Sequence, residues 1–451
     1  MAERFDLIVL GAGSAARDGA GKAKREYDAN VAMVERERWG GSCPNVACRP
    51  TKAYLVAAEL VYDVNTHAAE RGLEVSRATV DMSRLRAWKD SIRRDQDSWF
   101  ELLGSQYTAI RGEASFVDAR TIRVGDRELT SDRILIATGG RTAVPSIPGI
   151  EDVDWLDHVS ALELERVPDS LLVVGAGPVG LEFAQIFARF GSRVTLVSHG
   201  TQIAARADSE AANELMAALE DEGIDVVLTD GGVDQVSRKG DRVTASITGG
   251  REVVVTDILL ASGRVANIDA LRLDTIGVDA SVRGISVDEH QRTTVDGIWA
   301  AGDAAAGPLF TPTAQYQARI AVDDMFGNGT RSADYTVLPN AIFTDPELGA
   351  VGMTEAEARA NGYDVGVVKH PLASVTRAQY TGTRRGIYKI VFDRQTRAVL
   401  GVHVVSRGAS DIVGTLALAL RRGLTVDDMA NVHHVYPSYS EGLKAAAEQA
   451  T

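Results

Sequence analysis

Cysteine is nearly absent from this chain, which has two cysteines among 451 residues. Two cysteines are too few for the disulfide framework of a small secreted protein. No apolar run approaches the roughly 18 residues that a membrane helix needs, and no leader with a basic and an apolar part precedes the strand-like segment that starts at Phe5. The sequence therefore predicts a cytoplasmic protein with no membrane partner.

Positive charge is in deficit as well, because 48 lysines and arginines face 62 acidic residues and leave a formal net charge of -14. A surface of this sign repels phosphate backbones, so no nucleic-acid partner is expected. Apolar residues make up 45% and charged residues 24%, which is the composition of an ordinary globular protein. At roughly 150 residues per domain, the length predicts about three domains.

Two segments have the pattern of a nucleotide-binding β-α-β unit. The first begins with a buried strand at Phe5 to Leu10, continues with a helix that Gly11-Ala12-Gly13-Ser14-Ala15-Ala16 opens, and reaches a second strand at Val31 to Glu35. The second begins with an apolar strand, opens a helix at Gly175-Ala176-Gly177-Pro178-Val179-Gly180 and ends in a strand at Val194 to Val197. Each pattern predicts a strand, a tight turn, a helix and a parallel strand.

The glycines of these turns suit the pyrophosphate of a dinucleotide. Such a group needs backbone amides pointing at it, a helix N-terminus behind it and no side chain in the way. A single glycine-rich loop often serves only as a turn, but two loops between a strand and a helix favour two bound dinucleotides. The binding positions are Gly11, Gly13, Gly175, Gly177 and Gly180, with Ala16 tolerated in the first loop.

The ends of the second strands indicate which dinucleotide each unit binds. Glu35 can accept hydrogen bonds from both hydroxyls of an unmodified ribose, as in FAD, although a strand end can also carry a solvated acid. The matching place in the second unit is Ser198-His199, where no acid repels a 2′-phosphate and where Arg193 and Arg206 are near in sequence. We therefore expect FAD in the first unit and NADPH in the second, with NADH as the alternative.

The chain as a whole predicts an α/β protein with two Rossmann-like domains and a C-terminal α+β domain. Breaks near 150 and 265 divide it into an FAD-binding domain at 1–150 and 265–335, a nicotinamide-binding domain at 151–264 and a last domain at 336–451. Further elements are expected as helices at 53–70 and 82–103 and from Ala409 and Val426, as strands at 114–116, 121–124, 134–137, 388–392 and 399–406, and as a capping box from Thr354 to Glu357.

The two cysteines lie close together, at Cys43 and Cys48, directly after the first β-α-β unit. Proline is tolerated only in the first turn of a helix, so Pro50 predicts a helix that begins near Cys48, where its amides and dipole would stabilise a thiolate. The pair could instead be part of a metal site or two small buried hydrophobic residues. Because no second cysteine pair and no His-x₃₋₅-His pattern supplies further ligands, a redox pair is favoured and no metal site is expected.

In its motifs and their order, the whole chain resembles the pyridine nucleotide-disulfide oxidoreductases, a family that includes glutathione reductase, dihydrolipoamide dehydrogenase and mercuric reductase. The motifs are the Cys-x₄-Cys segment, Ala137-Thr138-Gly139, Gly263-Arg264, Ala300-Ala301-Gly302-Asp303, Phe343-Thr344-Asp345-Pro346-Glu347 and Tyr436-Pro437-Ser438-Tyr439-Ser440-Glu441-Gly442. The resemblance implies a homodimeric FAD flavoenzyme with a C-terminal dimerisation domain. It also implies that the enzyme oxidises a nicotinamide nucleotide and reduces a small-molecule or metal-ion acceptor.

The resemblance implies roles for individual residues too. Cys48 would lie against the flavin and receive its electrons, while Cys43 would attack the substrate. Lys52 would pair with Glu182 beside the flavin atom that accepts the hydride, and Asp303 would bind the ribityl chain. Further cofactor-binding positions are Gly41, Ser42, Thr138, Gly139, Gly263 and Gly302, and each active site would take Tyr436, His434 and Glu441 from the other subunit.

The closing motif departs from the family members that reduce disulfides. Those members have a histidine immediately before the proline of the motif, which works as an acid-base with a glutamate, whereas this chain has Tyr436 there. A tyrosine titrates near pH ~10, so it is a poor base at neutral pH. The ending Ser440-Glu441-Gly442-Leu443-Lys444 is similar to that of mercuric reductases, yet no extra C-terminal cysteine pair is present to deliver a metal ion.

Three interpretations of the function are open from the sequence. The favoured one is a mercuric reductase-like enzyme that passes electrons from NADPH through FAD and the Cys43/Cys48 dithiol to a metal ion, a quinone or a disulfide. The second is a dihydrolipoamide dehydrogenase-like enzyme in which His433 or His434 replaces the missing base. The third is a flavin-binding module without turnover.

Overall fold

The computed structural model describes residues 2–450, and backbone contacts divide the chain into two compact units. The first unit consists of Met1–Thr51, Ala87–Ala143 and Gly263–Asp334, and the second of Lys52–Arg86, Val144–Ser262 and Tyr335–Thr451. Each unit is therefore assembled from segments far apart in the sequence. The division into three domains with breaks near 150, 265 and 335 stays a prediction.

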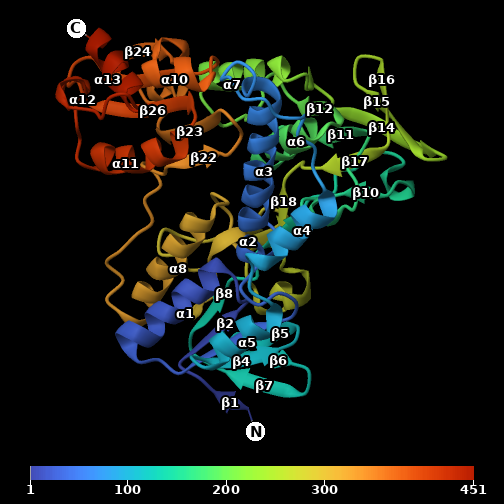
Figure 1. Ribbon diagram of the computed structural model, residues 1–451. Coiled ribbons are helices and arrows are strands. Elements are labelled where there is room, and N and C mark those ends of the chain that lie inside the picture. The colour runs from blue at the N-terminus through green and yellow to red at the C-terminus, as the bar shows by residue number, and fades with distance from the viewer. Residues whose placement is uncertain (1, 451) are drawn as a thin grey trace. The chain divides into compact units, whose positions relative to one another are not determined.

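The first unit is built on a five-stranded parallel sheet with the strand order β21-β8-β2-β3-β4 (Figure 1). Alternate side chains of a strand point to opposite faces. Leu7, Val9 and Leu135 accordingly pack under helices α1 and α8, while Ile8 and Leu10 face the other side. The elements are β2 (Leu7–Leu10), α1 (Ser14–Tyr27), β3 (Val31–Glu35), β4 (Thr108–Arg111), β8 (Ile134–Ile136), β21 (Ile298–Ala300) and α8 (Thr311–Phe326).

A smaller sheet with the order β1-β7-β6-β5 covers the second face of that parallel sheet. Its residues Phe116, Ile122 and Leu129 share one apolar core with Ile8 and Leu10. The parallel sheet is thus a middle layer between two helices and a second sheet. The covering strands are β1 (Glu3–Arg4), β5 (Ala114–Asp118), β6 (Thr121–Val124) and β7 (Arg127–Thr130), and the two-stranded pair β9 (Gly140–Thr142) and β18 (Arg264–Ala266) lies in the same unit.

The segment 82–103 forms two helices, so the prediction of a single helix there is wrong. Helix α4 (Met82–Ser91) ends before Asp95, and helix α5 (Gln96–Gly104) begins directly after it. The Asp95 carboxylate accepts a hydrogen bond from the backbone N–H of Ser98 at 2.8 Å. A side chain that caps a backbone N–H in this way starts a new helix, which apolar periodicity alone does not reveal.

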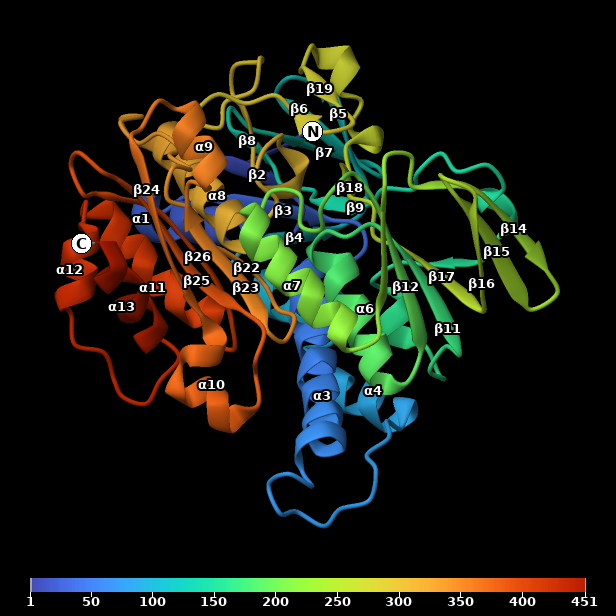
Figure 2. The same ribbon diagram turned by 90° about the horizontal axis from the view of Figure 1, so that it is seen from above.

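The second unit contains another five-stranded parallel sheet, with the order β10-β17-β11-β12-β13, which confirms the second predicted β-α-β unit. Leu171 and Val173 pack with Leu181 of α6, while Leu172 shares a core with residues of the antiparallel sheet β14-β15-β16. Figure 2 shows that sheet beside β11 and β17. The elements are β10 (Trp155–Leu156), β11 (Ser170–Val174), α6 (Pro178–Phe190), β12 (Arg193–His199), α7 (Ser209–Asp221), β13 (Asp225–Thr229), β14 (Val233–Lys239), β15 (Arg242–Ile247), β16 (Arg251–Val255) and β17 (Asp257–Leu260).

An antiparallel sheet with the order β22-β23-β26-β25-β24 completes the second unit. Leu348 and Val405 share a core with Leu215 of α7, and Val402 and Val404 pack on the other face with α11 and α13. The elements are β22 (Asn340–Ile342), β23 (Glu347–Gly352), α9 (Glu355–Ala360), β24 (Val365–Pro371), α10 (Thr376–Thr381), β25 (Ile387–Asp393), β26 (Val399–Ser406), α11 (Ala409–Arg421), α12 (Val426–Asn431) and α13 (Glu441–Ala447). The predicted strands, helices and Thr354 capping box of this region are confirmed, as is the α/β class.

Helix α3 (Cys48–His67) begins at Cys48, as Pro50 predicts, and has 20 residues. In the second unit, its Tyr54 is fully buried and donates a hydrogen bond to the backbone oxygen of Leu162 at 2.8 Å. Between residues 2 and 450, no helix is long and apolar enough to cross a membrane.

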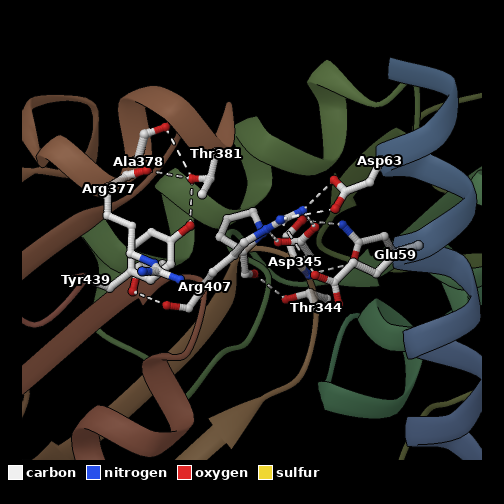
Figure 3. Close-up of polar contacts among 12 residues, drawn as sticks. Glu59, Asp63, Thr344, Asp345, Arg377, Ala378, Thr381, Arg407 and Tyr439 are labelled. Carbon is white, nitrogen blue, oxygen red and sulfur yellow. Dashed lines mark hydrogen bonds and ion pairs between the residues drawn. The ribbon is translucent and has the colours of Figure 1, made fainter. Parts of the chain in front are cut away.

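A buried ion network in the second unit fixes the segment that follows β22. Arg189 of α6 is ion-paired with Glu222 at 2.6 Å and with Asp345 at 3.1 Å. Arg407 donates to both carboxylate oxygens of Asp345, at 2.8 and 2.9 Å, and is ion-paired with Asp63 of α3 at 2.8 Å (Figure 3). Burial alone would raise the pKa of Asp345, but the hydrogen bonds and charges of Arg407 and Arg189 lower that pKa below its ordinary value. The network therefore holds α3, α6 and the Asp345 segment together.

We expect Arg189→Met to lower the free energy of unfolding by about 3–5 kcal/mol, because it leaves the buried carboxylates of Glu222 and Asp345 without their shared cation. Urea denaturation followed by circular dichroism measures this loss. Arg385→Met is the matched control, because it removes an exposed partner of Asp221, the residue next to Glu222, and should cost less than about 1 kcal/mol. Equal losses in the two variants would contradict a structural role for the buried network.

The stability difference between the native chain and Arg189→Met should depend on pH, because the pKa of Asp345 is lowered in the folded state. A carboxyl whose pKa is depressed on folding contributes stability above its unfolded pKa of about 4, and this contribution is lost as the pH falls. The difference in the free energy of unfolding between the native chain and Arg189→Met should therefore become smaller below about pH 4.

Candidate active site and cofactor-binding loops

The two glycine loops have the same backbone geometry at their first glycine. Gly11 and Gly175 both have a φ of 110°, which L side chains rarely adopt. A Cβ at Gly11 would lie 2.3 Å from the Ala137 oxygen, and one at Gly175 would lie 2.5 Å from the Ala261 oxygen. Glycine is therefore required at both crossings of backbone over backbone.

The helices that follow these loops begin with open backbone amides. Gly13 and Gly177 are the N-cap residues of α1 and α6, and neither helix has a side-chain cap or an acidic residue in its first turn. A Cβ at Gly180 would lie 1.8 Å from the Gly175 oxygen, so that position too needs glycine, whereas Ala16 is fully buried in the core under α1. Uncapped N–H groups at a positive helix end suit the pyrophosphate of a dinucleotide.

Glu35 is held in place by backbone N–H groups at the end of β3. Its carboxylate accepts hydrogen bonds from Ala12 N at 3.0 Å, Glu37 N at 2.8 Å and Arg38 N at 3.1 Å. It lines a surface cavity together with Gly11, Thr138 and Asn267. Carboxylate oxygens at such a strand end are suited to accept hydrogen bonds from ribose hydroxyls.

Thr138 lines the same cavity and supports binding of a polar ligand there. Its hydroxyl oxygen is buried and has no hydrogen-bond partner among residues 2–450. Buried polar atoms are normally satisfied, so an unpartnered hydroxyl in a cavity is expected where a polar ligand binds. The adjacent Gly139, with a φ of 71°, turns the chain there.

Asp303, which is expected to bind the ribityl chain of FAD, lies in the turn Gly302–Ala304 of the first unit. Its carboxylate accepts a hydrogen bond from Arg264 Nε at 2.7 Å, and the backbone N–H of Gly302 is bonded to Gln317 at 2.8 Å. Gly263 precedes Arg264 with a φ of 130°. An aspartate oriented by an arginine on one side can accept a ribityl hydroxyl on the other.

The carboxyl end of β12 carries Ser198 and His199, where the nicotinamide nucleotide is expected. Ser198 is buried and His199 is exposed. Arg193 begins the same strand, six residues before His199 and hence roughly 20 Å from the binding end. The structure therefore corrects the suggestion that Arg193 assists. Arg206, an exposed residue that follows the strand in sequence, is left as the candidate cation.

The cysteine segment packs directly on the first glycine loop. A Cβ at Gly41, whose φ is 79°, would lie 2.4 Å from the Gly13 Cα, so Gly41 allows the two backbones to touch. Ser42 and Cys43 form the first turn of the short helix α2 (Ser42–Asn45), and Cys48 is the first residue of α3. The Cys48 sulfur lies 3.6 Å from the Thr311 hydroxyl oxygen.

Lys52 and Glu182 form an ion pair in the second unit. Lys52 Nζ lies 2.9 and 2.8 Å from the two carboxylate oxygens of Glu182, and the glutamate side chain is only 5% exposed. Phe343 supports the pair twice, because its backbone N–H donates to Glu182 at 3.1 Å and its ring centroid lies 4.4 Å from Lys52 Nζ. The buried ion network described above holds the Phe343 segment through Asp345.

The C-terminal candidates lie in one segment of the second unit. Tyr436 is 72% exposed, and His434 Nδ1 lies 3.2 Å from the Ser440 hydroxyl. Glu441 accepts a hydrogen bond from Thr376 N at 3.0 Å, and its other carboxylate oxygen is buried without a partner among residues 2–450. Partial burial lowers the pKa of His434, and Lys444 lowers it further while Glu441 opposes the shift.

Two dinucleotide-type loops and an adjacent cysteine pair are features of a flavin-dependent oxidoreductase. The chain matches the family "Pyridine nucleotide-disulphide oxidoreductase" over residues 5–318 and the dimerisation domain of that family over residues 338–447. It therefore belongs to the pyridine nucleotide-disulphide oxidoreductases, FAD flavoenzymes whose members bind FAD and NAD(P)H. The matched dimerisation domain supports the expected homodimer.

Individual relatives confirm the resemblance to two branches of the family. Mercuric reductase of Lysinibacillus sphaericus is 36% identical over 452 residues, which cover 99% of this chain and 82% of the relative. Dihydrolipoyl dehydrogenase of Geobacillus stearothermophilus is 33% identical over 456 residues, covering 99% and 96%. The Cu(II) complex of the HOCl-induced flavoprotein disulfide reductase RclA from Escherichia coli has a TM-score of 0.87 and 29% identity, and 99% of each chain is covered.

Sequence reasoning missed Thr311, Phe343 as a support of Glu182, and Arg17, which packs on the Trp99 ring against the cysteine segment. The Thr311-Pro312 pair could have indicated a helix start, but nothing in the sequence links it to Cys48. Long-range partners of this kind have no local signal.

We expect Glu35→Gln to weaken FAD binding by about tenfold, because hydrogen bonds from ribose hydroxyls to a charged carboxylate are worth about 1.5–3 kcal/mol and those to an amide less. Titration of the apoprotein with FAD, followed by flavin fluorescence, gives the dissociation constant. Glu113→Gln, in the wall of the same cavity, is the control and should change it less than threefold, or about 0.6 kcal/mol. The ribose assignment fails if both variants bind equally well.

Proposed function

We propose that this oxidoreductase uses Cys43 and Cys48 as a redox-active pair between FAD and an electron acceptor. The observation that carries the proposal is the position of Cys48, which is the first residue of α3 and lies 3.6 Å from Thr311, the first residue of α8. Two helix N-termini therefore meet at one sulfur atom. Their partial positive charges stabilise a thiolate.

The cysteine pair carries two electrons from the flavin to the acceptor in the proposed cycle. Bound FAD would supply the chemistry of accepting a hydride from the nicotinamide nucleotide and releasing two electrons. Those electrons break the Cys43–Cys48 bond and leave a Cys48 thiolate and a Cys43 thiol or thiolate. The acceptor then takes two electrons, and the sulfur–sulfur bond forms again.

Lys52 and Glu182 contribute a fixed charge to this cycle. Their ion pair holds a cation at a constant place, and Phe343 restricts both side chains. A preorganised cation stabilises negative charge that develops during hydride transfer without reorganising at that moment. We therefore assign Lys52 to charge stabilisation and Glu182 to its orientation.

The acceptor that fits best is one that needs no proton from a C-terminal base, namely a thiophilic metal ion or a quinone. Tyr436 stands where a base is expected, and its side chain is largely exposed. The mercuric reductase relatives and the Cu(II) complex of RclA, which concern other chains, support a metal ion as acceptor. Thiolates are good ligands for soft metal ions.

NADPH is the proposed electron donor. At its end β12 carries Ser198 and His199 in place of an acid that would repel a 2′-phosphate. Arg206 is the nearby cation in sequence that could pair with such a phosphate.

We expect anaerobic NADPH to raise the thiol count of the native enzyme by two, because reducing one sulfur–sulfur bond releases two thiols. Cys43→Ala should still allow NADPH to bleach the flavin but should reduce Hg(II) at least a hundredfold more slowly, since the sulfur that binds the metal is gone. Thiol titration and NADPH oxidation with Hg(II), Cu(II) and quinones measure both effects. An unchanged thiol count would refute the redox pair.

The second candidate function is oxidation of a dithiol such as dihydrolipoamide, with His434 as the base. It is favoured by the contact of His434 with Ser440 and by the opposing effect of Glu441 on its pKa. The lowered pKa leaves His434 neutral at pH 7, as a base requires.

For this candidate we expect His434→Gln to slow NAD⁺ reduction by dihydrolipoamide at least tenfold. The native rate should fall on the acid side only below pH 6.5, because a lowered pKa keeps the ring neutral down to that range. His433→Gln is the control, since that side chain is exposed and should have little effect. Steady-state rates across the pH range measure this, and equal rates in both variants would exclude His434 as the base.

A further inference from the structure

Arg17 places a cation next to the segment that carries Cys43. It lies in the first turn of α1, where its backbone N–H donates to Gly13 at 2.9 Å. Its guanidinium carbon lies 4.9 Å from the ring centroid of Trp99. That ring in turn covers Gly40, where a Cβ would lie 2.6 Å from it, three residues before Cys43. Arg17 and the cysteine segment thus pack around one indole.

The charge of Arg17 is poorly compensated by neighbouring acids. Its Nε is buried and has no hydrogen-bond partner within residues 2–450. The adjacent Asp18 is ion-paired with Arg319, whose Nε lies 2.5 Å from its carboxylate. Burial lowers the pKa of the Arg17 guanidinium, while negative charge on Cys43 raises it, so a Cys43 thiolate and this cation attract each other.

The other charged groups near this segment are engaged elsewhere. Arg93 donates to Asn45 O at 2.9 Å and is paired with Asp90, and Arg49 donates to Ile92 O at 3.0 Å. The other charged side chains on α5 and just before it are Arg94, which also lies over Trp99 at 5.3 Å, Lys89 beside Asp90, Asp95 at the start of α5, Asp97, which is paired with Arg111, and Glu101. Tyr107 packs in the same core as Trp99, and negative charge on it would also raise the pKa of Arg17. Arg17 is therefore the cation that packs with the Cys43 segment around Trp99 and whose Nε is buried without a partner among residues 2–450.

We propose that Arg17 keeps Cys43 ionised at neutral pH and so replaces the base that the C-terminal motif lacks. The inference rests on the proposed role of Cys43 as the sulfur that attacks the acceptor. A thiol must lose a proton to a base before it attacks, whereas a standing thiolate needs none. The Cys43 thiolate forms a bond to the metal ion or to a disulfide sulfur, and the ligand anion or the second thiolate leaves. Arg17 acts through Cys43, as a positioning residue for its negative charge.

The chain allows each sulfur to be titrated alone, because it has only two cysteines. In the FAD-bound Cys48→Ser enzyme, the rate of alkylation of Cys43 by iodoacetamide is measured from pH 5 to pH 10 by mass spectrometry. We expect Arg17→Met to raise the midpoint by about one pH unit, the lower end of what a neighbouring opposite charge produces. At pH values well below both midpoints, the alkylation rate then falls by about tenfold.

Three further variants separate charge from packing. Arg17→Lys keeps the charge and should restore the midpoint, and Arg17→Gln, a polar neutral substitute in case the methionine variant folds poorly, should raise it as Met does. Arg94→Met removes the other cation over the same indole and should leave the midpoint unchanged. In the Cys43→Ser enzyme, Arg17→Met should leave the midpoint of Cys48 unchanged.

The inference is overturned if the Cys43 midpoint does not move in Arg17→Met and Arg17→Gln, if Arg94→Met moves it equally, or if Cys48 shifts by the same amount. The thiol count with NADPH tests the proposed function separately. If the thiol count rises by two but the Cys43 midpoint does not move, only the role of Arg17 is refuted. If the thiol count does not change, the redox pair itself is refuted, and the role of Arg17 with it.

Discussion

The constraint on which the rest of this structure depends is the close crossing of backbone over backbone at the first glycine loop. Gly11 passes the Ala137 carbonyl with no room for a Cβ, and Gly13 touches Gly41 in the same way. The first contact leaves the N-terminus of α1 open for a pyrophosphate. The second presses the cysteine segment onto that loop, so one stretch of glycine backbone positions both the cofactor and the sulfur atoms.

The charges that matter for this structure are the few carboxylates that are held away from water by cations, and not the large acidic excess at the surface. Most of its acidic residues lie at the surface, but the side chains of Glu182 and Asp345 are only 5% and 15% exposed, and cations hold both carboxylates in fixed geometry. Breaking such a pair is costly because the remaining charge stays out of water. The Asp345 network thereby orders Phe343, which in turn restrains Glu182 and Lys52.

The two sulfur atoms have different surroundings, and this difference suits different tasks. Cys48 has a hydroxyl and two helix N-termini, which stabilise charge by dipoles and hydrogen bonds. Cys43 lies in the segment that packs with the cation of Arg17 around the Trp99 ring. A chain with a tyrosine at the position of the usual base would gain most from a thiolate that is already ionised, since proton abstraction is then no part of the cycle.

The sequence by itself determined the two β-α-β units, the start of α3 at Cys48 and the antiparallel strands near the C-terminus, because glycine, proline and apolar periodicity act within a few residues. The sequence did not reveal the helix break at Asp95, where one capping side chain overrides an apolar pattern. Only the tertiary structure decided that Thr311 meets Cys48 across 263 positions, and that Arg193 lies at the wrong end of β12. Such contacts depend on how distant elements pack, which no local pattern encodes.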